Sequence, residues 1–248
     1  MMTNFWISEG IKVIVFFAIT FALGKWLVQR GVKANYTRKI FHFVFFFFSV
    51  VTVLVFPYEF SIELTLLSGC VLLACLIPMY QPIRERSQLL TTAFSSIDRP
   101  EDRPFTLLWV STQLLATYLV LILMLAWLDR YDMAILISIT WLIAGIGDGL
   151  AEPVGVRFGK RTYKVYALFT DRKYTRTLEG SLCVFASGIL AVALHIEVLN
   201  QQQFILALLI IPIVMALAEA LSPHTWDGPF LYLVGGASTV LVLELAQL

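Results

Sequence analysis

The chain has 248 residues, of which 59% are apolar and only 14% are charged, and its net charge is +1. A soluble domain has about 45–50% apolar and about 25% charged residues, so this composition excludes an ordinary soluble domain. The small net charge gives no overall field that would attract nucleic acid. We therefore expect an integral membrane protein without a nucleic-acid partner.

The apolar residues are concentrated in eight blocks, each long enough to cross the ~30 Å hydrocarbon core of a bilayer at ~1.5 Å per residue. The blocks are residues 11–28, 40–56, 62–80, 105–128, 133–150, 181–199, 204–221 and 229–247. A span in lipid must satisfy its backbone hydrogen bonds internally, which favours helices, and the alternating segments of a transmembrane barrel are absent. The sequence therefore predicts an all-α transmembrane bundle of about eight spans that forms a single domain, residues 1–248.

The basic residues predict the orientation of this bundle. Fifteen of the 18 lysines and arginines lie in three alternate connections, residues 29–39, 81–104 and 157–180. The intervening connections contain only Arg130, and they are residues 57–61, 129–132 and 200–203. Under the positive-inside rule, the three basic connections face the cytoplasm and both termini lie on the non-cytoplasmic side.

Four short polar clusters interrupt the apolar background, and the predicted topology places all of them on the cytoplasmic side. They are Arg38–His42, Gly147–Pro153, Arg176–Ser181, and Glu219–Pro223 together with Trp226–Gly228. The topology rests only on apolar blocks and on counts of basic residues, so the convergence of the clusters is a separate indication of a functional site at that face.

Asp148 lies between Gly147 and Gly149 near the end of its block, and glycines let a backbone approach a ligand closely. If the helix continues, Glu152 follows one turn later on the same face. Two such carboxylates suit Mg²⁺, which keeps several waters and bridges to substrate phosphates. The alternative is a break at the helix end with a solvated Asp148. We favour the metal role because ionisable residues at membrane depth are generally functional.

The stretch 155–176 is strongly basic and contains a turn at 159–161 with Lys160 at its centre. A nucleoside triphosphate would need such cations and the backbone amides of a helix N-terminus. The alternative is that most of these charges fix the topology and touch anionic lipid head groups. Arg176 is the strongest candidate for a phosphate contact, because we expect a helix with free N-terminal amides to begin after Gly180. The other candidates follow Arg176 directly in the sequence, and they are Thr177, Glu179, Gly180 and Ser181.

Two further clusters contain candidate residues. Arg38 and His42 are four residues apart and share a helical face, with Lys39 beside them, although snorkelling cations and a packed histidine would explain them too. Glu219 has no cation within one helical turn, so we expect it to pair with a group on another helix or to bind a metal. Asp227 follows in a short connection without lysine or arginine, and its nearness to Glu219 makes it a second acidic candidate.

In this order and on this number of spans, the clusters resemble the family of dolichol kinases and phytol kinases. These are membrane enzymes that phosphorylate isoprenoid alcohols, typically with CTP, and they are distantly related to phosphatidate cytidylyltransferases. The resemblance covers roughly residues 30–240. The matching residues are Arg38, Lys39, His42, Gly147, Asp148, Gly149, Ala151, Gly155, Gly159, Glu179, Gly180, Ser181, Glu219, Ala220, Leu221 and Asp227.

Two positions depart from the family pattern. Arg176 stands where lysine is usual, and Gly228 stands where asparagine usually follows the last aspartate. Arginine keeps the charge but replaces a point donor with a fork of donors. The Gly-Gly…Asp-Arg-x-Asp ending of the cytidylyltransferases is absent from the sequence, which favours the kinase branch.

The resemblance implies transfer of the CTP γ-phosphoryl group, with Mg²⁺, to phytol or a polyprenol in the membrane. It implies metal binding by Asp148 with Glu152 or Glu219. The implied nucleotide-binding residues are Arg38, Lys39, Gly147, Gly149, Lys160, Arg176, Thr177, Gly180 and Ser181. The implied catalytic residues are Asp148, Glu179, Glu219, Asp227 and His42, of which Glu219, Asp227 or His42 would orient or deprotonate the alcohol.

Two other functions remain open at this point. A cytidylyltransferase would use the same groups to form a CDP-activated lipid and release pyrophosphate. A cation-coupled transporter would also contain acids within its spans, but transporters usually place such acids near the midplane of the bilayer. Here the acids gather at one face, which makes a transporter the least favoured of the three.

Overall fold

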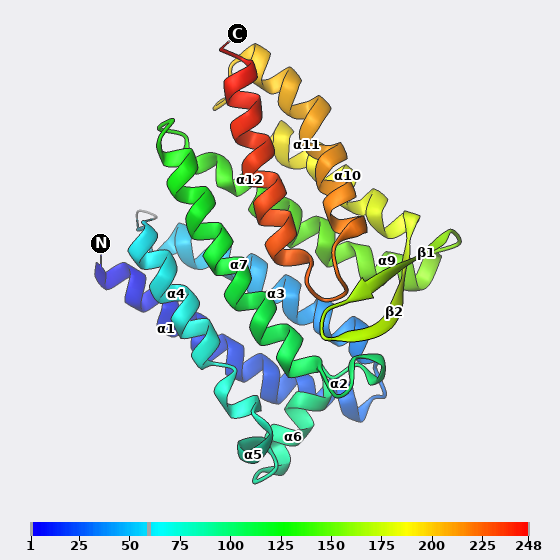
Figure 1. The fold of residues 1–248 in the computed structure, drawn as a ribbon. Helices are drawn as coiled ribbons and strands as arrows, with labels where there is room; N and C mark the ends of the chain where they lie inside the picture. Colours follow the sequence, from blue (N-terminus) through cyan, green and yellow to red (C-terminus); the bar gives the residue numbers. More distant parts are fainter. Residues whose placement is uncertain (1, 59–60, 248) are drawn as a thin grey trace. The chain divides into compact units, whose positions relative to one another are not determined.

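The computed structural model describes residues 2–58 and 61–247, and most of these residues are helical (Figure 1). Within this part of the chain, seven helices are long and apolar enough to span a membrane. They are Met2–Gln29, Ala34–Val55, Ile62–Met79, Thr106–Asp129, Ala134–Phe158, Gln201–Leu221 and Asp227–Leu245. A shorter apolar helix, α10 (Leu178–Ala193), accounts for the remaining predicted block. The prediction of an all-α, multi-pass membrane protein is confirmed, and the orientation of its termini stays a prediction.

The chain divides into two compact units, residues 1–115 and 116–248, and the boundary falls within α7 (Thr106–Asp129). Each unit has its own packing, and the expectation of a single domain stays a prediction. The predicted connection 57–61 includes residues 59–60, which lie outside the described residues.

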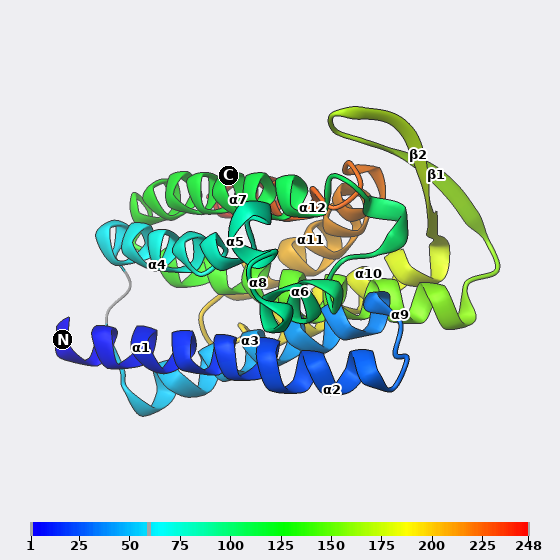
Figure 2. The same cartoon turned by 90° about the horizontal axis from the view of Figure 1, so that it is seen from below.

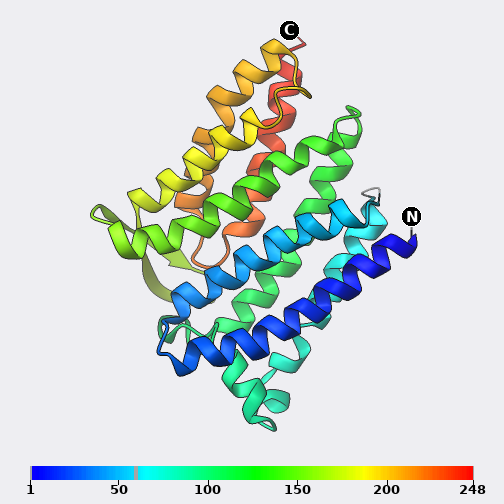
Figure 3. The ribbon, with the colours of Figure 1, turned by 180° about the vertical axis from the view of Figure 1, so that it is seen from behind.

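Unit 1 is built around its first long helix. α1 (Met2–Ala18) continues through a π-helical turn (Ile19–Leu23) into α2 (Gly24–Gln29). α3 (Ala34–Val55) and α4 (Ile62–Ala74) both pack against α1, and α3 is seen beside it in Figure 3. These helices are apolar over most of their surface, as expected for helices that contact lipid.

The connection from α4 to α7 in unit 1 contains more structure than the predicted loop 81–104. A 3-10 turn (Ile77–Met79) is followed by α5 (Gln81–Arg84), α6 (Gln88–Ser95) and a second 3-10 turn (Pro100–Asp102). The short helices are held by a small buried cluster of Met79, Ala93 and Phe94. The sequence analysis treated this stretch only as a carrier of positive charge.

Unit 2 contains the larger apolar core. α10 packs along α11 (Gln201–Leu221), and α11 packs along α12 (Asp227–Leu245) (Figures 1 and 3). α11 begins with a capping box, in which the side chains of Asn200 and Gln203 each bond to the other's backbone N–H. The buried side chains between these helices include Val184, Ile211 and Met215.

The fifth span continues beyond its predicted end at residue 150. A 3-10 turn (Ala134–Leu136) leads into α8 (Ile137–Leu142), the π-helical turn η5 (Ile143–Asp148) and α9 (Gly149–Phe158). The glycines around Asp148 therefore do not end the helix. The helix also continues through Pro153, which lies inside α9 although it has no N–H to donate. Asp148 and Glu152 lie on one continuous helix, as the metal hypothesis requires.

The basic connection 157–180 contains an antiparallel hairpin that was not predicted. Its strands are β1 (Thr162–Ala167) and β2 (Thr170–Thr177), and Tyr163 is paired with Arg176 in their register. Buried and exposed residues alternate along β1, whereas β2 is mostly exposed and buries only Tyr174. Figure 2 shows that the strands run across the ends of α10, α11 and α12 rather than along them.

The hairpin is fastened to the connection between α11 and α12. The His224 N–H donates to the Tyr166 carbonyl at 2.8 Å, and the His224 ring stacks on the Tyr174 ring with centroids 3.8 Å apart. Because β2 leads directly into α10, this attachment brings the end of β2 close to the end of α11 and the start of α12.

Candidate functional site

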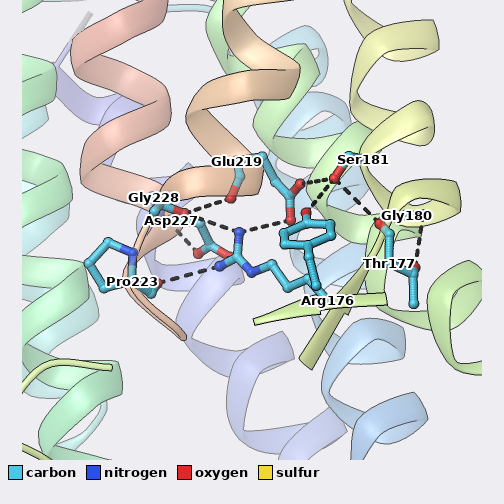
Figure 4. Close-up of polar contacts among 10 residues, drawn as sticks. Arg176, Thr177, Gly180, Ser181, Glu219, Pro223, Asp227 and Gly228 are labelled. Carbon is cyan, nitrogen blue, oxygen red and sulfur yellow. Dashed lines mark hydrogen bonds and ion pairs between the residues drawn. The ribbon is translucent and has the colours of Figure 1, made fainter. Parts of the chain in front are cut away.

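Arg176 is at the centre of a polar cluster in unit 2 (Figure 4). Its side chain is only 11% exposed, and its Nη1 donates to Glu219 Oε1 at 3.0 Å and to Ser222 Oγ at 3.2 Å. Its Nη2 donates to the Pro223 carbonyl at 3.4 Å and forms an ion pair with Asp227 Oδ2 at 3.6 Å. A single guanidinium therefore joins β2 to the end of α11 and the start of α12.

The charge of Arg176 is stabilised by its acidic neighbours. Burial alone disfavours the charged guanidinium, but the negative charges of Asp227, Glu219 and Asp148 outweigh this effect. The pKa of Arg176 therefore lies above its ordinary value. Asp148 belongs to η5, so a fourth segment of unit 2 acts electrostatically on the same cation.

Glu219 is buried in the last turn of α11, where it is 5% exposed. Both of its oxygens are engaged: Oε1 accepts from Arg176, and Oε2 accepts from Ser181 Oγ at 2.9 Å. An isolated carboxylate at this position would be very costly, and its two partners remove most of that cost. Glu219 was predicted to pair with a group on another helix or to bind a metal. Its hydrogen-bond partner Ser181 is on helix α10, whereas its ion-pair partner Arg176 is on strand β2.

A chain of hydroxyl groups leads away from Glu219. Ser181 Oγ donates to Glu219, and it lies 2.7 Å from the Tyr163 hydroxyl. Burial is the main reason that the pKa of Tyr163 is raised. Tyr163 was not among the predicted site residues, because its position depends on the strand register. The available signal was the short alternation of apolar and polar residues in 163–167, which is typical of a strand.

The junction between β2 and α10 fixes the position of Ser181. Thr177 caps α10, and its hydroxyl accepts from the Gly180 N–H at 3.1 Å. The prediction that this helix begins after Gly180 is wrong: it begins at Leu178, because the threonine side chain satisfies an amide of the first turn. The Gly180 amide is therefore not a free donor for an anion.

α9 approaches this junction very closely. A Cβ atom at Gly155 would lie 2.6 Å from Thr177 Oγ1, and one at Gly180 would lie 2.7 Å from the Ala151 carbonyl oxygen. Any side chain at these two positions would force α9 and α10 apart. The two glycines thus hold the helix that carries Asp148 directly against the start of α10.

Glu179 lies in the first turn of α10, and its carboxylate is held by backbone N–H groups. Oε1 accepts from the Arg161 N–H at 3.4 Å, and the N–H groups of Glu179 itself and of Lys160 also stabilise the carboxylate. Its role as a catalytic residue stays a prediction.

Arg38 belongs to a second charged cluster, which lies in unit 1. Asp102 is fully buried there, and its Oδ2 accepts from Arg99 Nε at 2.7 Å and from Arg38 Nη1 at 3.2 Å. The sequence analysis counted Arg99 only toward the topology and missed Asp102, whose burial depends on tertiary packing. His42 and Lys39 lie on the same helix as Arg38, α3, and both are partly buried.

The structure places the predicted site residues in three groups. Unit 2 brings together Arg176, Thr177, Gly180, Ser181, Glu219 and Asp227. The segment η5–α9 of unit 2 carries Gly147, Asp148, Gly149 and Glu152, of which the two glycines are buried, and Lys160 follows it as an exposed residue. Unit 1 contains Arg38, Lys39 and His42.

The acidic residues do not form a preassembled metal centre. In residues 2–58 and 61–247, no group of three or more His, Cys, Asp or Glu side chains is arranged to hold a metal ion. Asp148, Glu152 and Glu219 are therefore not a three-carboxylate cage. Metal binding by one or two of them stays a prediction.

Comparison with family models, with curated proteins and with solved structures finds no match to this chain. The resemblance to dolichol kinases and phytol kinases rests on the sequence motifs.

Proposed function

We propose that the chain is a membrane kinase that transfers the γ-phosphoryl group of CTP to the hydroxyl group of an isoprenoid alcohol, of the phytol or polyprenol type, at the cytoplasmic face. The observation that carries the proposal is the cluster around Arg176. There a buried arginine, two carboxylates and a serine hydroxyl from β2, α10, α11 and α12 meet at the ends of apolar helices. A water-soluble phosphate donor and a lipid hydroxyl can meet only at such a boundary.

Arg176 is the candidate for binding the transferring phosphoryl group, because a guanidinium binds phosphate oxygens in a bidentate way. Its two nitrogens are held unequally: Nη1 lies 3.0 Å from Glu219, whereas Nη2 lies 3.6 Å from Asp227. Phosphate oxygens would replace Asp227 at Nη2 more easily than they would replace Glu219 at Nη1. Glu219 would then keep the guanidinium in position.

Asp227 is the residue that would orient the lipid hydroxyl and accept its proton. An exchange at Arg176 Nη2 releases the Asp227 carboxylate beside the bound phosphate, where a general base is needed. Glu219 is less suited, because both of its oxygens are engaged by Arg176 and Ser181. We therefore prefer Asp227 to Glu219 and to His42.

The residues fit a Mg²⁺ ion that arrives with the nucleotide. Such an ion needs only one or two protein carboxylates, since phosphates and water supply its other ligands. Asp148, with Glu152 one turn later or with Glu219, would hold it, and Asp148 already acts on the charge of Arg176. The bound ion would neutralise charge on the phosphates during transfer.

The direct test is phosphoryl transfer by the purified protein in lipid nanodiscs. We would supply Mg²⁺, CTP labelled at the γ position and, in turn, phytol, farnesol, a polyprenol and diacylglycerol. We expect label on an isoprenoid alcohol, and a loss of at least about 100-fold in rate for Asp148→Asn, since one electrostatic contact to a transition state has this value. Asp132→Asn, an exposed aspartate in the turn after α7, is the matched control and should keep full activity.

The same assay separates the proposed kinase from its two rivals. Label from the α position of CTP on the lipid, with release of pyrophosphate, would show a cytidylyltransferase. Absence of transfer to every lipid, or full activity in Asp148→Asn, would contradict the proposal. Uptake of cations by sealed vesicles containing the protein would then be measured, because the transporter is the remaining alternative.

A further inference from the structure

The β1–β2 hairpin has one packed face and one exposed face. Val165, Ala167 and Tyr174 are at most 8% exposed and form the packed face. Tyr166 is 55% exposed, and Phe169 at the tip is 59% exposed. Large apolar side chains that remain in water contribute nothing to folding, so packing within unit 2 does not explain this pair of rings.

The exposed face of the hairpin is strongly basic. Residues 157–177 contain seven lysines and arginines and a single acid, Asp171. Arg176 turns inward to Glu219, and the other six cations are exposed. Lys173 is paired with Tyr166 across the strands, and Lys164 lies two residues from Tyr166 on the same face. Aromatic rings and cations therefore alternate on one surface.

The position of the hairpin in the chain indicates that it lies next to the membrane surface. It connects α9 to α10, two apolar helices, so it lies where these helices leave the membrane. The contacts of His224 hold it across the ends of the helices of unit 2 (Figure 2). Aromatic residues concentrate at this boundary of a bilayer, and lysines and arginines close to it attract anionic head groups.

The backbone at the tip is consistent with a use for the Phe169 ring. This residue has a φ of 64°, in the left-handed region where glycine and asparagine are usual and a bulky side chain is disfavoured. Strained residues of this kind persist where the side chain has a role. A glycine would make the same turn more easily but would leave no ring at the tip.

We propose that the exposed face of the hairpin binds the anionic phospholipid head groups of the adjacent leaflet, with the rings of Tyr166 and Phe169 at the boundary between head groups and acyl chains. Charge complementarity selects this partner: Lys164 and Lys173 lie on this face, and the exposed Arg172, at the register irregularity beside the tip, adds a third charge. Because Arg176 is on the same strand, β2, the lipid contact also steadies the strand that positions Arg176. In a neutral bilayer the hairpin is fastened by its contacts within the protein alone.

Hydrogen exchange of the hairpin amides tests this proposal without any assay of activity. The full chain would be placed in nanodiscs of phosphatidylcholine and in nanodiscs of an equal mixture with phosphatidylglycerol. Each basic residue near an anionic surface changes the association by about fivefold, so three of them give about 100-fold. We expect exchange at the tip, residues 168–172, to be at least about tenfold slower in the anionic nanodiscs.

Two sets of variants complete the test. In Lys164→Gln/Arg172→Gln/Lys173→Gln the protection by anionic lipid should disappear, and in Phe169→Ser it should be reduced. The matched control neutralises three exposed cations of unit 1, Lys25→Gln/Arg30→Gln/Lys33→Gln, and should leave the protection unchanged.

Three outcomes would overturn the proposal. The first is equal exchange of the wild-type tip in both lipid compositions. The second is protection that survives in the triple hairpin variant, provided that this variant has the melting temperature of the wild type. The third is protection by added polyglutamate but not by phosphatidylglycerol, which would assign the face to an acidic protein instead.

Discussion

The two charged clusters of the molecule are built in opposite ratios. In unit 1, one buried carboxylate, Asp102, serves two arginines, Arg38 and Arg99. In unit 2, one buried arginine, Arg176, serves Glu219 and Asp227. The two ion pairs of Arg176 differ in length: 3.0 Å to Glu219 and 3.6 Å to Asp227. The longer pair makes the unit 2 cluster suited to an exchange of partners during a reaction.

The largest expected effect is at Arg176. Arg176→Met leaves two carboxylates close together and without their cation, and removing one partner of a buried ion pair costs about 3–5 kcal/mol. We expect the free energy of unfolding in detergent to fall by that amount and phosphoryl transfer to be lost. The control is Arg176→Met/Glu219→Gln/Asp227→Asn, which removes all three charges and should regain most of the stability but no activity. If Arg176→Met alone were as stable as the wild type, Arg176 would not be the cation that stabilises the two carboxylates of unit 2.

A smaller effect is expected in the unit 1 cluster. Asp102→Asn keeps the shape of the side chain and removes its charge, so the two arginines keep a neutral acceptor. The loss of charge-assisted hydrogen bonds should lower the free energy of unfolding by about 1.5–3 kcal/mol, measured by chemical denaturation. Glu85→Gln is the matched control, because the exposed Glu85 accepts from the exposed Gln81 side chain, a contact that should be worth at most about 1 kcal/mol. Equal losses in the two variants would remove the distinction between buried and surface pairs.

The smallest expected effect sharpens the assignment of Tyr163 to the unit 2 cluster. Its pKa is raised in the folded protein, mainly by burial, so its contribution to stability is complete below its unfolded pKa of about 10 and is lost as the pH rises through the folded value. Tyr163→Phe removes the hydrogen bond to Ser181, at a cost of about 1 kcal/mol near neutral pH, and should flatten the fall in stability above pH ~10. Tyr166→Phe, on the exposed face of the same strand, should do neither. An unchanged alkaline slope in Tyr163→Phe would separate this residue from the cluster.

The helices of this protein could be predicted because a span in lipid has no alternative way to satisfy its backbone. The pairing of Glu219 could be predicted for the same reason, since a lone carboxylate among apolar side chains is costly. The hairpin was hidden because its second strand, residues 170–177, is mostly polar and shows no clear alternation of apolar and polar residues. Asp102 and Tyr163 could not be found from spacing, because both depend on which distant residues pack beside them.

The end of the fifth span shows a different reason for an incorrect prediction. The sequence Gly147-Asp148-Gly149 with Pro153 after it is typical of a helix end, yet the helix continues to Phe158. Local preferences are weak compared with the packing of α9 on α10, where Gly155 meets Thr177. Gly147, one of the glycines that suggested a break, also lies against α10, where an added Cβ would be 2.9 Å from the Val184 Cα.

The junction of β2 with α10 makes the cluster unusually sensitive to insertions and deletions. Arg176, the cap residue Thr177 and Ser181 lie within six consecutive residues, and Ser181 points to Glu219 only because the helix begins at Leu178. Each residue of an α-helix advances the side-chain direction by about 100°. Deleting one residue between Thr177 and Ser181 would turn the serine hydroxyl away from its carboxylate, whereas one residue more or fewer at the hairpin tip would leave this alignment in place.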